Sequence, residues 1–117
     1  MTGKKFFQYN KYKNKSCTCN VGHIHDSRGE ARYCDELQLL KKAKEISDFE
    51  IQKTFSLKAY DKHITNHRVD FVIIKNDGSQ EVHEFKGFAT DVWKLKQKLF
   101  EANFPEIPYI VVHGMGN

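Results

Sequence analysis

Apolar and polar residues follow one another along the chain in two rhythms, which predict helices and strands. Over residues 28–46 the apolar side chains recur at helical spacing, and charged residues take the opposite side. Residues 48–57 alternate between apolar and polar, which predicts a strand with one buried face. The helix has an apolar stripe that needs a sheet to cover it, made of Tyr33, Cys34, Leu37, Leu40 and Ile46.

The remaining pattern predicts a turn at 61–63 and then four further elements. They are strands over 67–74, 81–86 and 109–112 and a second helix from a cap at Thr90 or Asp91 to about Asn103. The last strand is apolar throughout, as in strands at the centre of a sheet or in parallel pairing. The order α-β-β-β-α-β predicts one α/β domain with a mixed sheet flanked by helices.

The segment Asn76-Asp77-Gly78-Ser79 joins two of the predicted strands and is a strong hairpin signal. A two-residue loop, Asp77-Gly78, would place Asp70 opposite Phe85. A three-residue loop that ends on a left-handed Gly78 would place Asp70 opposite Glu84. The position of Gly78 as the last loop residue favours the second register.

Asp70 and Glu84 are then candidate metal ligands. Two carboxylates at cross-strand contact distance repel, so their pairing makes sense mainly with a hard divalent cation between them. Lys86 lies two residues after Glu84, on the same face of its strand. Such a group suggests phosphodiester hydrolysis, with the lysine neutralising charge on the phosphate. The alternative is that Asp70 pairs with Arg68 or His67, and that Glu84 and Lys86 form an exposed ion pair.

Other charged residues could extend this site. Glu30 ends an S-x-x-E capping box that starts at Ser27, but it also leads the apolar stripe of the first helix. Lys96 falls at the edge of the packed face of the second helix. Lys94 and Lys98 share another face and could track a phosphate backbone, and simple solvation is the alternative for all three lysines.

Length and charge restrict the function classes. With 117 residues, a net charge of +4 and a mean hydropathy of -0.66, the chain should form one small domain rather than a multidomain enzyme. No stretch approaches the roughly 20 apolar residues of a membrane span, and MTGKKFFQYN lacks the apolar run of a signal peptide. We therefore expect an intracellular, cytoplasmic protein without a membrane partner or a small-molecule cofactor.

The positive charge is concentrated in an N-terminal arm, residues 1–25, ahead of a domain over 26–117. Without the lysines of residues 1–16, the chain has a net charge of −1. Aromatic residues lie between these lysines, a combination suited to phosphates and accessible bases. A solvated basic tail whose aromatics dock on the domain is the alternative. The candidate DNA-binding lysines of the arm are Lys4, Lys5, Lys11, Lys13 and Lys15.

The arm also contains four potential zinc ligands within nine residues, namely Cys17, Cys19, His23 and His25. This C-x-C and H-x-H spacing differs from the usual C-x2-C of zinc sites. A hairpin that leads into the first helix is the alternative. The three cysteines of the chain, an odd number, imply no disulfide framework.

These residues together resemble the PD-(D/E)xK nuclease superfamily. The resemblance rests on the element order, a helix acid at Glu30, a strand acid at Asp70 and the E-x-K of residues 84–86, followed by Gly87. More narrowly, residues 26–112 are similar to a family of short phage-encoded proteins of unknown function that are considered nuclease-like. The segments that carry this similarity are DSRGEARYCDELQLLKKAKEI, FEIQKTFSL, HRVDFVI and EVHEFKGFATDVWKLKQKLFEANFP.

The resemblance implies a restriction-endonuclease-like core and a Mg²⁺- or Mn²⁺-dependent deoxyribonuclease related to Holliday junction resolvases. Such an enzyme would cut branched DNA in phage recombination or replication, as a homodimer. Asp70 and Glu84 would then ligate the metal with help from the Phe85 carbonyl. Lys86 would orient water or stabilise the transition state. By the same resemblance, Glu30 would hold a second ion or a water, and Gln52, together with Lys96, would position water or phosphate.

Overall fold

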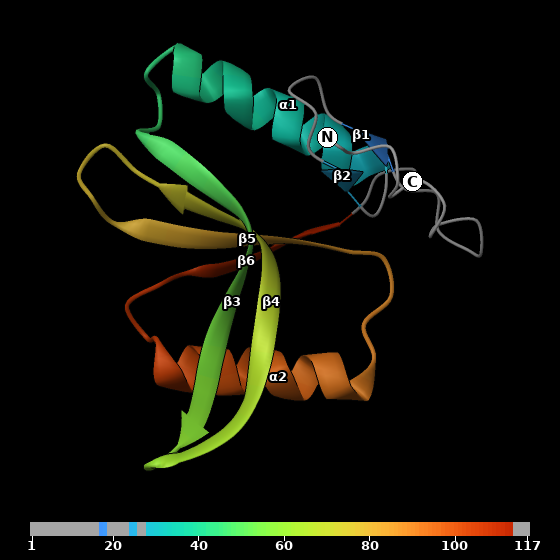
Figure 1. The fold of residues 1–117 in the computed structure, drawn as a ribbon, viewed down its shortest axis with the longest axis vertical. Helices are drawn as coiled ribbons and strands as arrows, with labels where there is room; N and C mark the ends of the chain where they lie inside the picture. Colours follow the sequence, from blue (N-terminus) through green and yellow to red (C-terminus); the bar gives the residue numbers. More distant parts are fainter. Residues whose placement is uncertain (1–16, 19–23, 26–27, 114–117) are drawn as a thin grey trace.

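The computed structural model describes residues 17–18, 24–25 and 28–113 (Figure 1). Its helices and strands confirm the predicted order α-β-β-β-α-β, preceded by two short strands. The elements are β1 (Cys17–Thr18), β2 (Ile24–His25), α1 (Arg28–Lys42), β3 (Asp48–Ala59), β4 (Lys62–Ile74), β5 (Gln80–Lys86), α2 (Asp91–Asn103) and β6 (Tyr109–His113).

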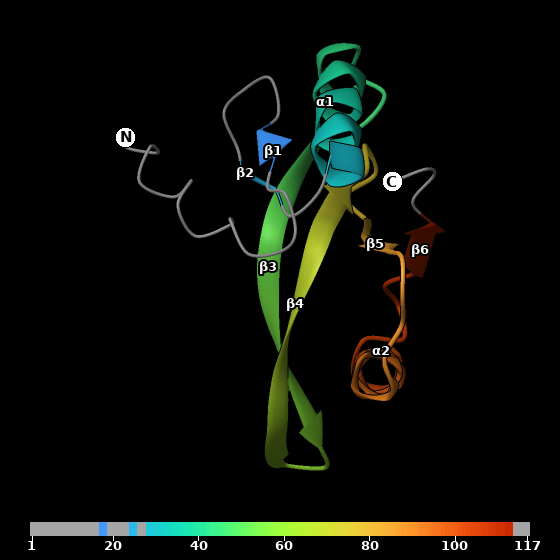
Figure 2. The ribbon, with the colours of Figure 1, turned by 90° about the vertical axis from the view of Figure 1, so that its right-hand side faces the viewer.

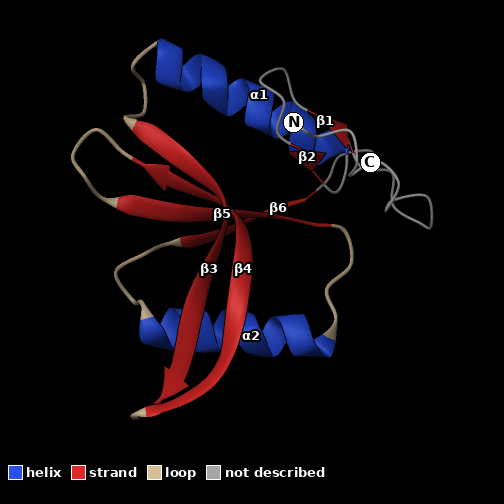
Figure 3. Cartoon of the chain, in the orientation of Figure 1, coloured by secondary structure: helices blue, strands red, loops and turns tan. Residues whose placement is uncertain are grey.

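The larger sheet has the strand order β3-β4-β5-β6 (Figure 3). Its first three strands are antiparallel, and β6 pairs parallel with β5 after the crossover through α2. The sheet is therefore mixed, as predicted. The parallel pairing of β6 is confirmed, but β6 lies at the edge of the sheet rather than at its centre, and Ile110 is 38% exposed.

The two helices cover opposite faces of this sheet. Ile73 packs in one buried cluster with Cys34 and Leu37 of α1, whereas its neighbour Val72 packs in a second cluster with Phe100 of α2. Because successive residues of a strand point to opposite faces, α1 and α2 lie on different sides of β4. Figure 2 shows the long β3–β4 hairpin rising past α2 toward α1.

The β3–β4 hairpin changes its buried partner at one position. Ile51 and Phe71 pack in the α1 cluster, but Phe55 and Val69, of the same odd parity, pack in the α2 cluster. Gln52 lies between them with a φ of 53°, in the left-handed region that residues other than glycine rarely adopt. This irregularity lies where the buried face of the hairpin changes from the α1 cluster to the α2 cluster. One hairpin therefore packs against both helices.

The β4–β5 hairpin has the register that the three-residue loop predicted. Phe71 pairs with His83 and Ile74 with Gln80. Gly78 has a φ of 90°, and the Lys75 amide donates to the Ser79 carbonyl at 2.8 Å. The left-handed glycine therefore sets the alignment of Asp70 with β5.

Two predicted boundaries are wrong. The first helix ends at Lys42, not near residue 46, because Lys44 adopts a φ of 64° and the Glu45 amide donates to the Leu40 carbonyl at 2.9 Å. This bond, with that from Lys44 to the Lys41 carbonyl, forms a Schellman motif without its usual glycine. The turn expected at residues 61–63 is formed by residues 60–61 instead, so β4 begins at Lys62.

The second helix begins as predicted. Thr90 is its N-cap, and its hydroxyl oxygen accepts a hydrogen bond from the Trp93 amide at 3.1 Å. In the described part of the chain, neither this helix nor α1 has the length and apolar character needed to cross a membrane.

The end of α1 provides a test of the left-handed conformation. We expect Lys44→Gly to raise the free energy of unfolding by about 1 kcal/mol, because a side chain in this conformation is strained and glycine is not. Lys42→Gly, in the last helical turn, should instead lower it by about 0.5–1 kcal/mol. Urea denaturation measures both, and equal destabilisation by the two changes would contradict the assigned helix end.

Candidate active site

A cavity of about 540 Å³ opens where α1, β4, β5 and α2 meet; we call it the Asp70 cavity. Six residues predicted for the site line it, namely Glu30, Asp70, Glu84, Phe85, Lys86 and Lys96. The structure thus brings together side chains that are up to 66 positions apart in the sequence. The cavity is also lined by His67, Arg68, Thr90, Val92 and Trp93.

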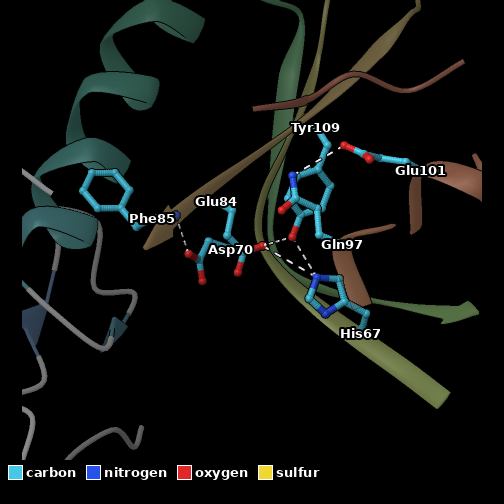
Figure 4. Close-up of polar contacts among 7 residues, drawn as sticks. All are labelled: His67, Asp70, Glu84, Phe85, Gln97, Glu101 and Tyr109. Carbon is cyan, nitrogen blue, oxygen red and sulfur yellow. Dashed lines mark hydrogen bonds and ion pairs between the residues drawn. The ribbon is translucent and has the colours of Figure 1, made fainter. Parts of the chain in front are cut away.

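Asp70 lies where β4 and β5 separate. Their pairing ends at Phe71 and His83, whereas β5 continues to pair with β6 as far as Lys86. Beyond this point the Asp70 carboxylate replaces a backbone carbonyl as the acceptor for β5. Its Oδ2 accepts a hydrogen bond from the Phe85 amide at 2.8 Å (Figure 4). The backbone around the E-x-K motif is therefore tied directly to the strand acid.

Glu84 is 4% exposed and points toward Tyr109 and His67 (Figure 4). The Tyr109 hydroxyl donates to Glu84 Oε1 at 2.8 Å, and His67 Nε2 lies 2.8 Å from the same hydroxyl oxygen. Burial raises the pKa of Glu84, and the charge of Glu30 adds to this rise. The hydrogen bond from Tyr109 and the charge of Lys86 oppose it. Two buried carboxylates thus face each other's charge in one cavity.

His67 is a neutral member of the cavity. It is 4% exposed, and burial, followed by the positive charges of Lys96 and Lys86, lowers its pKa to about 4. Its Nε2 lies 3.9 Å from Glu84 Oε1, but at neutral pH this contact is not an ion pair. Burial also raises the pKa of Tyr109, followed by the charge of Glu84, so its hydroxyl keeps its proton.

The two lysines bring positive charge to the same cavity. Lys86 Nζ lies 5.1 Å from the centroid of the Trp93 ring, a cation–π distance. Lys96 lines the cavity from α2, as its place at the edge of the packed face predicted.

The comparisons with known proteins give one result. Residues 9–114 match the family described as "Protein of unknown function (DUF1064)". The chain belongs to this family. No curated protein and no solved structure matches it. The DUF1064 match spans β1 and β2 as well as every residue that lines the Asp70 cavity.

Several predicted site residues lie elsewhere. Gln52 stands across from Asp70 in the β3–β4 register but does not line the cavity. Lys94 and Lys98 are exposed on α2, also outside it. Other predicted residues lie outside the described part of the chain, namely Lys4, Lys5, Lys11, Lys13, Lys15, Cys19, His23 and the capping residue Ser27.

The hairpin expected before the first helix is present. β1 and β2 pair antiparallel, with Cys17 opposite His25 in the backbone register. In the described part of the chain, no group of three or more His, Cys, Asp or Glu side chains is arranged so that it could hold a metal ion.

Sequence reasoning missed His67, Trp93 and Tyr109 as members of the site. His67 was considered only as a partner for Asp70, and it bonds to Tyr109 instead. Tyr109 belonged to a strand read as wholly apolar. The one available signal was that Tyr109 opens this strand with a hydroxyl, which must find a partner when buried.

The lowered pKa of His67 predicts a pH-dependent stability. Unfolded His67 has a pKa near 6.5, so the unfolded state binds a proton between pH 6.5 and 4 that the folded state does not. The wild type should therefore lose up to about 3 kcal/mol more than His67→Gln as the pH falls across this range. Urea denaturation of both proteins at several pH values measures this, and parallel curves would contradict it.

Proposed function

We propose that this DUF1064 chain is a metal-dependent nuclease that hydrolyses phosphodiester bonds in DNA, a PD-(D/E)xK-like enzyme. The observation that carries the proposal is the shared cavity: Asp70, Glu84 and Lys86, singled out by their sequence pattern, line one cavity with Glu30. If the E-x-K motif had only a structural role, Glu84 and Lys86 were expected to form an exposed ion pair. Instead Glu84 is buried and accepts a hydrogen bond from Tyr109.

The donor types fit a hard cation, although the three carboxylates are not already arranged around one point in this structure. Glu30 and Glu84 are 3% and 4% exposed, and their like charges oppose each other. Carboxylate oxygens are the ligands that Mg²⁺ and Mn²⁺ prefer, so Asp70, Glu84 and Glu30, with the Phe85 carbonyl, would hold the ion. When bound, the ion supplies a Lewis acid for the phosphate and an activated water.

The basic side chains of the cavity act on the phosphate. Lys86 and Lys96 carry positive charge on the walls that face the acids, and Arg68 lines the same cavity. In this low-dielectric space they stabilise negative charge that develops on the phosphate oxygens during hydrolysis. The Trp93 ring holds the Lys86 ammonium from one side, which keeps it directed into the cavity.

Surface lysines would bind the DNA backbone on either side of the phosphate that is cut. Lys94 and Lys98 are exposed on α2, on another face of the helix than Lys96. They and the lysines of the N-terminal arm would neutralise phosphates. The preference for branched DNA and the homodimer come from the resemblance to junction resolvases and stay predictions.

Cleavage of labelled four-way junction, flap, duplex and single-stranded DNA in Mg²⁺ or Mn²⁺ tests the proposal. We expect Asp70→Asn to lower the rate by at least about 100-fold, as loss of a transition-state electrostatic group does. EDTA should abolish cleavage by the wild type. Asp61→Asn, in the exposed β3–β4 turn, is the matched control and should cut at the wild-type rate.

Equal cleavage by Asp70→Asn and the wild type would overturn the assignment. DNA binding without any cleavage, weakened by salt and indifferent to EDTA, would instead favour the second function, a DNA-binding module that keeps the nuclease-like fold.

A structural zinc ion in the N-terminal hairpin is a separate candidate, which would stabilise an interaction domain. Its supporting observation is the backbone register, in which Cys17 stands opposite His25. Metal analysis tests this candidate.

If the zinc ion is present, purified protein should hold about one zinc per chain, and Cys17→Ser should lose it and melt at a lower temperature. Cys34→Ala, which changes the buried cysteine of α1, is the control and should keep the zinc. Zinc-free wild-type protein, or a Cys17→Ser protein with unchanged zinc, would rule the ion out.

A further inference from the structure

Tyr109 lies behind Glu84 and does not itself line the Asp70 cavity. Its phenol has a single hydrogen, which it donates to Glu84 Oε1 at 2.8 Å. His67 must then be the donor in the second bond, from Nε2 to the Tyr109 oxygen at 2.8 Å. The three side chains form a directed chain from His67 through Tyr109 to one oxygen of Glu84 (Figure 4).

The Tyr109 ring is held from several sides. Its centroid lies 5.1 Å from that of Phe100 and 6.3 Å from that of Trp93. The His67 ring stacks on it at 6.0 Å with an interplanar angle of 21°. In the parallel register of β5 and β6, Tyr109 stands opposite Val82, two positions before the partner of Glu84. The hydroxyl therefore has one fixed direction, toward the Glu84 carboxylate.

We propose that Tyr109, supported by His67, is a positioning residue that fixes the Glu84 carboxylate for a divalent cation. The bond to Oε1 sets the rotation of the carboxylate and leaves Oε2 for the ion. A partner of this kind orients a metal ligand and lowers the entropy lost when the ion binds. The inference rests on the proposed function, because it takes Glu84 as a ligand.

A merely structural role for Tyr109 makes a different prediction. Loss of a buried hydrogen bond would lower stability but leave the affinity for a cation unchanged. The positioning role predicts that metal affinity falls even at temperatures where the variant is fully folded. Metal affinity measured without DNA therefore separates the two roles, independently of cleavage.

The experiment is a calorimetric titration of the full chain with Mn²⁺. Tyr109→Phe keeps the ring and removes the hydroxyl, and we expect it to bind Mn²⁺ about 10-fold more weakly than the wild type. Tyr33→Phe is the matched control, because Tyr33 also bonds to a histidine, His83, but makes no hydrogen bond to Glu84. It should bind Mn²⁺ like the wild type.

Two histidine variants carry the same test if Tyr109→Phe does not fold. Gln at position 67 offers an N–H donor and Leu does not, so His67→Leu should weaken Mn²⁺ binding more than His67→Gln. Equal binding by the two would overturn the inference, as would unchanged binding by folded Tyr109→Phe.

The outcomes for the inference and for the proposed function differ. Wild-type protein that binds Mn²⁺ and cuts DNA, with Tyr109→Phe equally tight, overturns the positioning role alone. Mn²⁺ binding that depends on Tyr109 without any cleavage supports the positioning role and contradicts the nuclease. A wild type that does not bind Mn²⁺ overturns both.

Discussion

The separation of β4 from β5 is the constraint on which the site depends. Past Phe71 and His83 the two strands no longer pair, and a carboxylate replaces the backbone ladder by accepting the Phe85 amide. A buried amide needs an acceptor, and a charged acceptor makes a stronger bond than a carbonyl. One side chain thus completes the hydrogen bonding of β5 and brings negative charge to the place where the strands make room for a cavity.

The cavity also lies at the seam between two buried clusters. The α1 cluster and the α2 cluster meet at the level of Gln52 and Asp70. On one side of this level the β3–β4 hairpin packs against α1, and on the other side it packs against α2. Each helix contributes to the cavity from its own side, Glu30 from α1 and Lys96 from α2. The cavity therefore draws residues from both packing units, which are joined by β4 and β5.

Much of this arrangement could be predicted from local signals. Asn-Asp-Gly fixes the register of the β4–β5 hairpin, and Asp70 and Glu84 line one cavity just past the end of this pairing. The end of the first helix was not predicted, because it has no such signal. The residue in the left-handed conformation after this helix is Lys44, whereas glycine is the usual residue there. Tyr109 escaped prediction for another reason. Its partner is 25 residues away, and tertiary packing alone brings them together.

The pairing of β6 has a consequence for a chain that is still being made. Glu84 and Asp70 precede α2, but the hydroxyl that donates to Glu84 comes after it, on the last strand described. A nascent chain that stops before Tyr109 has the acids and the lysines without their support. If the acids serve a nuclease, a premature product would carry a poorly formed cutting site, and full activity would await the docking of the final strand.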